Sequence, residues 1–416
     1  MLRRGQDVYI GMLMIMIAGT FLSPQRFFLL SIVYYVVLIL KMGLKIVLPN
    51  APGIKLYGVI VMYTAIIGFV MYATRNVIRD LYYILPTFLW IFIGTGEAFR
   101  RPDKNLKKTI FLYGTFVSVK SFVLFIASAS FDFNRLRSIF GLNVYDVGFI
   151  MPIAVVGIFL YKEIYISCII DRIILALMFG QVILSLGRIA ILQPFIILAI
   201  LLLMESRGAE NKRVLKRIAG LLISMVVIFG VFFYIMPNNI KNPLMEKVVN
   251  SFAEVDASQE ISSVGQAMNN WRGYEIQSAQ SQWKSNGIFS KFLGEGLGKG
   301  IEIQYVPLNW VSVVEESEIP LLHNGFYTML IKGGVLGLAA LLWMFWGNAM
   351  KGLRLSKKKN PYGNILIAIS IAAIANTYVV RGPIQQGTFL IWAVLIGWIN
   401  CKINKSVPIE VVSSEV

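Results

Sequence analysis

Several residue types are scarce in this chain, and each scarcity excludes a class of protein or site. The 416 residues include two cysteines, Cys168 and Cys401, and one histidine, His323. Two cysteines make neither a disulfide framework nor a zinc site built on thiolates. A single histidine excludes a metal site with several histidine ligands, so we expect no metal. Charged residues make up 15% of the chain, against about 25% in soluble domains, which argues against an ordinary soluble enzyme.

The low fraction of charged residues is matched by a high fraction of apolar residues. The chain is 57% hydrophobic and its mean hydropathy is +0.69. A helix that crosses the roughly 30 Å hydrocarbon core of a bilayer needs about 20 mostly apolar residues. The sequence therefore predicts an all-α polytopic membrane protein with about twelve transmembrane helices. These lie near 8–22, 27–47, 56–73, 81–98, 109–130, 147–161, 172–187, 189–204, 218–236, 326–349, 364–380 and 388–400.

The positive charges predict the orientation of these spans. The net charge is +17, from 39 Lys plus Arg and 22 Asp plus Glu. With twelve spans, three basic loops lie on the same side as both termini, which the positive-inside rule makes cytoplasmic. A nucleic-acid face would need an extended basic polar surface, so we expect no nucleic-acid partner. The loops contain Arg100, Arg101, Lys104, Lys107 and Lys108; Arg207, Lys212, Arg213, Lys216 and Arg217; and Lys351, Arg354, Lys357, Lys358 and Lys359.

One predicted external loop is long, polar and net acidic. Loops beyond about 15 residues are rarely mere connectors, and residues 266–285 have helical spacing of apolar side chains. A glycine run at 294–300 follows, which we interpret as a turn that shapes a site. It lacks the Ser or Thr that a phosphate-binding loop needs after its lysine. We therefore predict three parts: helices 1–9 over residues 1–236, an external loop domain with short helices over 237–325, and helices 10–12 with a cytoplasmic tail over 326–416.

His323 is the first candidate for chemistry. It lies where the long loop re-enters the membrane, shortly after Glu315, Glu316 and Glu318. A carboxylate beside an imidazole raises its basicity and fixes its tautomer, so we predict a proton acceptor for a sugar hydroxyl. Glu318 and Asn324 are then candidates for binding the substrate. In the alternative interpretation His323 only caps the helix start, with Asn324 as its partner.

Five arginines near the predicted external face are the second group of candidates. Charged groups at membrane depth are costly and usually functional, although those at helix ends also extend to the headgroups without further role. Guanidinium groups bind phosphate oxygens in pairs, so several of them predict a diphosphate ligand held next to lipid. The five are Arg188, Arg272, Arg381, Arg135 and Arg137.

Three motifs in order make the chain resemble the O-antigen polymerase and O-antigen ligase family of bacterial envelope biogenesis. The first is Ser185-Leu-Gly-Arg188. The second is Trp271-Arg-Gly-Tyr274, which leads to the glycine run Phe292-Leu-Gly-Glu-Gly-Leu-Gly-Lys-Gly300. The third is His323-Asn-Gly-Phe326 with Lys332-Gly-Gly-Val-Leu-Gly337. The resemblance covers roughly residues 173–350, and the rest matches only as apolar spans.

The resemblance implies a GT-C-like, metal-independent membrane glycosyltransferase of the bacterial inner membrane, with no cofactor. Its donor would be an oligosaccharide on undecaprenyl diphosphate, presented at the outer face among the membrane lipids. Arg188 and Arg272 would hold the diphosphate, and His323 would orient or deprotonate the acceptor hydroxyl. A chain-length regulator protein is a partner that polymerases of this kind usually have.

Three functions stay open at this point. A polymerase would transfer the growing glycan to another lipid-linked repeat unit, whereas a ligase would transfer it to lipid A core. We favour the polymerase, because His323-Asn-Gly-Phe326 followed by Lys332-Gly-Gly-Val-Leu-Gly337 is more similar to polymerases. A flippase or exporter of lipid-linked sugar is the third. A proton-coupled carrier usually needs several carboxylates within its bundle, and this chain has few.

Overall fold

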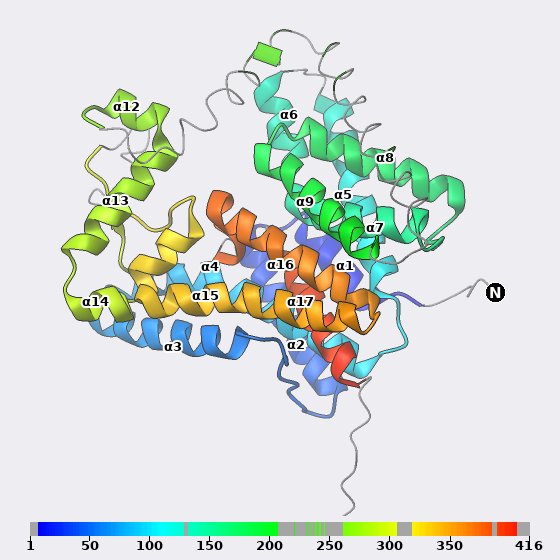
Figure 1. The fold of residues 1–416 in the computed structure, drawn as a ribbon, viewed down its shortest axis with the longest axis horizontal. Coiled ribbons are helices and arrows are strands. Elements are labelled where there is room, and N and C mark those ends of the chain that lie inside the picture. The colour runs from blue at the N-terminus through cyan, green and yellow to red at the C-terminus, as the bar shows by residue number, and fades with distance from the viewer. Residues whose placement is uncertain are drawn as a thin grey trace, which may run out of the picture.

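The computed structural model describes residues 7–128, 132–206, 261–305, 318–384 and 389–405, with isolated residues between 220 and 245. These residues are almost entirely helical (Figure 1), and β1 and β2 form a short antiparallel pair. The elements are α1 (Ile10–Gly19), α2 (Pro24–Lys41), α3 (Ile54–Met71), α4 (Thr74–Arg100), α5 (Leu106–Ser128), α6 (Phe133–Phe140), α7 (Val144–Phe159), α8 (Cys168–Leu184), α9 (Arg188–Glu205), α12 (Val264–Asn269), α13 (Trp271–Ser285), α14 (Ile288–Leu293), β1 (Ile301–Glu302), β2 (Glu318–Ile319), α15 (Gly325–Lys357), α16 (Pro361–Val380), η3 (Gly382–Ile384) and α17 (Leu390–Lys405).

The prediction of a polytopic helical membrane protein is confirmed by helix length and hydropathy. Among the described residues, seven helices are long and apolar enough to cross a bilayer: α2, α3, α4, α5, α9, α15 and α16. The bent pair of α6 and α7, with 65° between them, raises the number to eight if it is one span. The predicted spans near 8–22, 172–187 and 388–400 coincide with the shorter helices α1, α8 and α17. The span predicted near 218–236 lies outside the described residues.

The centre of the bundle is formed by α4, α15, α16 and α17. Two-thirds of the most apolar window of α16 is buried, against 11% for α2, so α16 lies inside the bundle and α2 at its periphery. Aromatic side chains join the central helices, since Trp392 of α17 contacts Phe345 of α15 edge to face. The outer helices leave many large apolar side chains exposed, as expected of surfaces that face lipid.

The long helix α15 is broken near its beginning, at Gly334. This residue has φ 62° and ψ −164°, which is not helical. The backbone N–H groups of Glu295 and Gly296 donate to the carbonyl oxygens of Ile331 and Lys332, both at 3.0 Å, directly before the break. A Cβ at Gly334 would lie 2.4 Å from the Gly294 nitrogen. The break therefore makes room for the glycine run and gives its N–H groups acceptors, as buried non-helical backbone in a membrane requires.

A buried ion pair fastens the same junction. Lys332 Nζ lies 2.5 Å from Asp80 Oδ2 of α4, and both side chains are at most 2% exposed. Gly298 N–H donates to the same carboxylate oxygen at 2.7 Å, and Leu297 N–H donates to the Thr64 carbonyl of α3 at 2.9 Å. The glycine run and the Lys332-Gly-Gly motif, distant in sequence, thus form one joint that holds the loop region against α3, α4 and α15.

The loop region has a small core of its own beside this joint. Helices α12, α13 and α14 gather at the end of the bundle where α15 begins (Figure 1). The predicted helical segment at 266–285 is confirmed as α12 and α13, interrupted at Asn270. Its buried apolar side chains belong to a separate cluster of Ala267, Tyr274, Ala279, Ile301, Ile303, Ile319, Leu322 and Ile331. The last of these lies on α15, so this core positions α13 relative to the bundle.

A candidate active site lined by arginines

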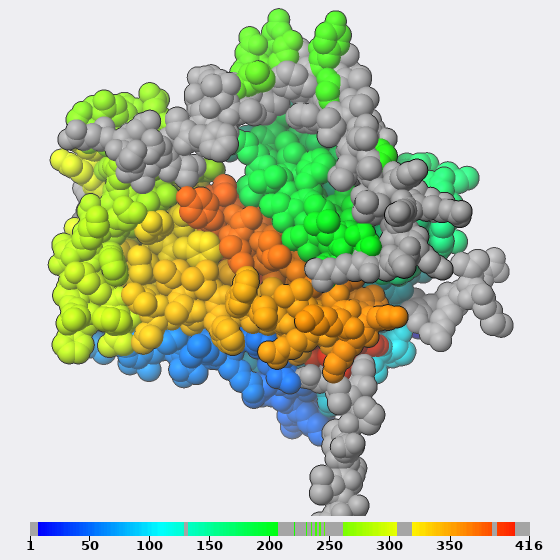
Figure 2. Space-filling model, viewed as in Figure 1, coloured from blue at the N-terminus to red at the C-terminus, as the bar shows by residue number. Residues whose placement is uncertain are grey.

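A cavity of about 440 Å³ lies where the ends of several helices meet. Its size falls within the range of small-molecule binding sites. In the space-filling view, the orange-red end of α16 lies at the foot of a recess between α12–α13 in lime and α9 in green (Figure 2). The lining residues are Arg137, Tyr145, Leu186, Gly187, Arg188, Ile189, Met268, Asn269, Trp271, Arg272, His323, Val379, Val380 and Arg381.

Two of the lining arginines lie in the first turn of a helix. Arg188 is the first residue of α9, directly after the N-cap Gly187. Arg272 is the second residue of α13. The first turn of a helix carries unpaired N–H groups and the positive end of the helix dipole, which both favour anions. These two arginines therefore add full charges at places where the backbone already favours a negative ligand.

Glu275 of α13 holds His323 in a fixed orientation. Its Oε1 lies 2.9 Å from His323 Nδ1, and its Oε2 accepts the backbone N–H of His323 at 2.8 Å. Trp271 Nε1–H donates to Oε1 at 2.7 Å. The glutamate side chain is 2% exposed, whereas the histidine is 35% exposed and lines the cavity. A buried carboxylate thus accepts Nδ1–H of an imidazole that remains open to the cavity.

The carboxylate partner of His323 is Glu275 and not the expected Glu318. Glu318, predicted to neighbour the histidine and bind substrate, instead accepts hydrogen bonds from Lys299 Nζ at 3.1 Å and Gly300 N–H at 3.2 Å. It does not line the cavity. Glu315 and Glu316 lie outside the described residues. One sequence feature associates Glu275 with the site. It follows the candidate Arg272 by three residues, so the two side chains share a helix face.

Arg381 lines the cavity and also holds the segment that carries His323. Its backbone has φ +73°, and its backbone N–H donates to the His323 carbonyl at 2.7 Å. The guanidinium Nε–H donates to the Leu322 carbonyl at 2.9 Å. Burial lowers the pKa of Arg381, while the nearby Glu275 carboxylate opposes this change. Arg381 is therefore a positioning residue for His323 as well as a cation at the cavity wall.

Asn324, not His323, caps helix α15. Its Oδ1 accepts the N–H groups of Phe326 at 3.0 Å and Tyr327 at 3.3 Å. Its Nδ2 is buried and has no hydrogen-bond partner among the described residues. A small adjoining cavity of about 10 Å³ is lined by Asn324, Arg272 and His323. The cap leaves the imidazole available for Glu275 and leaves one amide donor beside the main cavity.

The last two predicted arginines are separated by the structure. Both lie on α6 and are exposed, but only Arg137 lines the cavity. Arg135 lies in the first turn of α6, where its backbone N–H donates to the Asp132 cap at 2.9 Å. Arg137 therefore joins Arg188, Arg272 and Arg381 around the cavity, and Arg135 does not.

The cavity lies alongside membrane helices. Thr87 Oγ1 of α4 donates to the Pro383 carbonyl at 2.8 Å, in the turn directly after Arg381. At 1.5 Å per residue, Thr87 lies about 20 Å along α4 from Thr74. The turn that follows Arg381 thus packs against the middle of a helix long and apolar enough to cross a membrane.

Four arginines line this cavity, and Glu275 is the carboxylate bonded to its histidine. Within the described ranges, no group of three or more His, Cys, Asp or Glu side chains gathers as a metal site. The arrangement can bind an anion with two or more phosphate-like oxygens, with an oriented imidazole beside it. Comparisons of the chain with protein-family models and with curated proteins gave no match.

Proposed function

We propose that this chain is a membrane glycosyltransferase that polymerises repeat units carried on undecaprenyl diphosphate. The observation that supports it is the meeting of Arg188, Arg272 and Arg381 with the His323–Glu275 pair in one cavity beside membrane helices. A lipid diphosphate matches the arginines in charge and reaches the cavity from the bilayer. The oriented histidine matches the need for a proton acceptor.

The proposed reaction exchanges one carbon–oxygen bond for another. An acceptor hydroxyl oxygen attacks the anomeric carbon of the donor sugar, and the bond from that carbon to the diphosphate oxygen breaks. Nε2 of His323 takes the hydroxyl proton, because Nδ1–H is already donated to Glu275. The arginines stabilise the charge that develops on the departing undecaprenyl diphosphate. Such preorganised electrostatic stabilisation is worth several kcal/mol, about 2.7–4 for a single donor in another enzyme.

The proposal includes the number of spans and their orientation in the membrane. It places about twelve spans in a GT-C-like arrangement in the bacterial inner membrane, with both termini in the cytoplasm. The cavity then opens at the external face, and the basic ends of α4 and α15 lie at the cytoplasmic face, in accord with the positive-inside rule. The energy for transfer arrives with the donor, since no ATP is present outside.

Product analysis tests the proposal directly. The purified full chain in nanodiscs is given lipid-linked repeat unit, and the products are sized by mass spectrometry. A ladder of lengthened lipid-linked glycans is expected. Arg188→Ala, Arg272→Ala and His323→Ala should each slow formation of the ladder by at least about 100-fold while the protein stays folded. Arg135→Ala is the matched control, because it removes an arginine of the same region that does not line the cavity.

Other results would point to the other functions. Transfer to lipid A core without lengthening would indicate the ligase. Movement of lipid-linked sugar across the membrane with its size unchanged would indicate the flippase or exporter. Full ladders from the Arg272 and His323 variants would overturn the assigned roles.

A further inference from the structure

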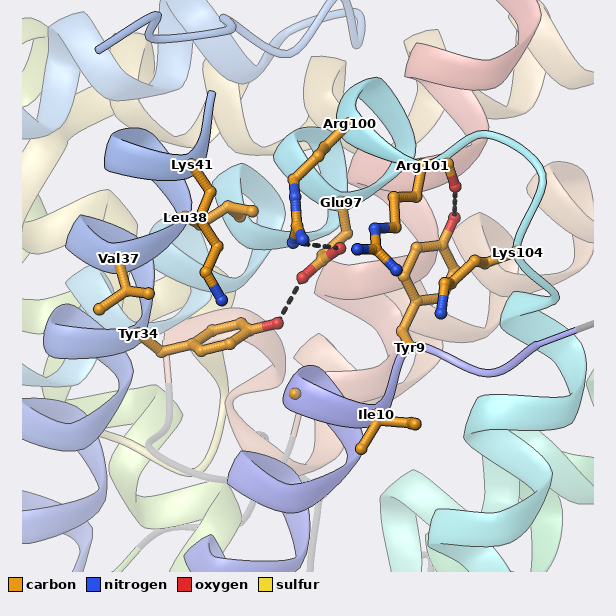
Figure 3. Close-up of a pocket in the computed structure, with 11 residues that line it drawn as sticks. Tyr9, Ile10, Tyr34, Val37, Leu38, Lys41, Glu97, Arg100, Arg101 and Lys104 are labelled. Carbon is orange, nitrogen blue, oxygen red and sulfur yellow. Dashed lines mark hydrogen bonds and ion pairs between the residues drawn. The ribbon is translucent and has the colours of Figure 1, made fainter. Parts of the chain in front are cut away.

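A second cavity lies at the other end of α4 from Thr74. It has a volume of about 160 Å³ and lies between α1, α2, the end of α4 and the loop that follows (Figure 3). This pocket shares no lining residue with the cavity that contains His323. Arg100, at the end of α4, lies about 20 Å along that helix from Thr87, which contacts the turn after Arg381. The lining residues are Tyr9, Ile10, Gly11, Tyr34, Val37, Leu38, Lys41, Glu97, Arg100, Arg101 and Lys104.

The charge of this pocket is strongly positive. Four cations line it, Lys41, Arg100, Arg101 and Lys104, against one lining carboxylate, Glu97. Asp7, outside the lining, lies 3.9 Å from Lys104 Nζ. Glu97 is already engaged, since it accepts from the Tyr34 hydroxyl and pairs with Arg100 Nη1 at 3.9 Å. In the part of the chain that the structure describes, no carboxylate pairs with Lys41 or Arg101.

Figure 3 shows the charged ends of Lys41, Arg100 and Arg101 spread around Glu97. Such an excess of cations matches an anion of more than one charge.

The frame around these cations is built by hydrogen bonds between distant segments. The Tyr9 hydroxyl donates to the Arg101 carbonyl at 2.7 Å and accepts from Trp398 Nε1–H at 2.9 Å. The Tyr9 backbone N–H donates to Thr109 Oγ1 at 3.0 Å, and Lys104 Nζ donates to the Val8 carbonyl at 3.1 Å. The backbone that carries the cations is therefore held in place before any ligand arrives, which lowers the entropic cost of binding.

The walls of the pocket also have an apolar, exposed side. Ile10 of α1 is 61% exposed and Val37 of α2 is 38% exposed. Neighbouring residues of α2 continue this exposed apolar surface, at Val33, Val36 and Leu40. A cationic pocket bordered by a lipid-facing surface matches an amphiphile better than a soluble anion.

We propose that this pocket binds the headgroup phosphate of an anionic phospholipid from the leaflet on the predicted cytoplasmic side. The volume equals that of roughly five water molecules, which suits a phosphate group but not a whole lipid. Lys41, Arg100, Arg101 and Lys104 surround the phosphate, and an acyl chain lies along Ile10 and Val37 of the exposed surface. Basic residues beside the membrane are a recognised means of binding anionic headgroups.

Lipid titration tests the proposal. The purified, delipidated full chain is titrated with phosphatidylglycerol, with phosphatidylcholine of the same acyl chains, and with inorganic phosphate. Retained lipid is counted by native mass spectrometry, and Tm is measured in parallel. We expect phosphatidylglycerol alone to be retained and to raise Tm. Removal of each cation near a membrane surface weakens binding about fivefold, so Lys41→Gln with Arg101→Gln should weaken it roughly 30-fold.

The control removes equal charge on the same predicted face outside the pocket, by Lys357→Gln with Lys358→Gln, and should keep the affinity. Arg101→Gln alone retains the backbone carbonyl that Tyr9 contacts, so it serves if the double variant does not fold. Equal retention of phosphatidylcholine, equal stabilisation by inorganic phosphate, or an equal loss of affinity in the control would each overturn the proposal.

Discussion

The substitution Glu275→Gln replaces the carboxylate that is hydrogen-bonded to His323 with an amide of nearly the same size and shape. The carboxylate accepts three N–H groups, from Trp271 Nε1, His323 Nδ1 and the His323 backbone. A glutamine side chain has one oxygen, and its amide nitrogen is a donor. In either orientation of the amide, at least one of these N–H groups therefore faces another donor.

This geometry predicts two effects, one on the free energy of unfolding and one on the rate of polymerisation. An unsatisfied buried donor costs about 1–3 kcal/mol, so Glu275→Gln should lower the free energy of unfolding by that amount. General base catalysis contributes about 10²–10⁴ in rate, and an imidazole without its carboxylate loses both orientation and basicity. We therefore expect a loss of polymerisation of at least about 100-fold in a protein that still folds.

Initial rates of ladder formation and Tm should be measured together. Glu302→Gln is the control, because it removes an exposed carboxylate of the same region that pairs only with Lys299 in the described structure. If Glu275 acts through His323, the double variant with His323→Ala should be no slower than His323→Ala alone. Full activity of Glu275→Gln, or a further loss in the double variant, would refute the positioning role.

Two further predictions concern the joint between the glycine run and α15. Asp80→Asn keeps an acceptor for Gly298 but leaves Lys332 as a buried unpaired charge, which should destabilise the protein by about 3–5 kcal/mol. Adding Lys332→Met should restore most of the lost Tm, and no restoration would contradict the ion-pair account. Gly334→Ala places a Cβ 2.4 Å from backbone atoms at positive φ, so the level of folded protein in membranes should fall. Gly287→Ala, with open space around it, should leave that level unchanged.

The apolar runs and the helical spacing within the long loop could be predicted from the sequence because their causes are local. A run of about 20 apolar residues reaches across a bilayer whatever its neighbours are, and α3, α4, α5, α9, α15 and α16 follow such runs. The helical spacing at 266–285 likewise predicted the region of α12 and α13. Arg188 and His323 stood out because each is a charged or titratable group beside an apolar segment, whereas Arg272 stood out as an arginine of the long external loop, in Trp271-Arg-Gly-Tyr274.

The partners of these residues were decided by packing between distant segments. Glu275 and His323 are 48 residues apart, and Asp80 and Lys332 are 252 apart. Proximity in sequence favoured Glu318 for His323, but the tertiary structure directs Glu318 to Lys299. Composition could not separate Arg137 from Arg135, because only the orientation of α6 against the bundle brings one of them to the cavity.

The sequence by itself determined that the chain spans a membrane many times and where its charges interrupt the apolar runs. The tertiary structure decided which of those charges meet. The physical reason is range: hydropathy and helical period act over one segment, whereas an ion pair or a cavity requires two segments whose separation depends on every helix packed between them.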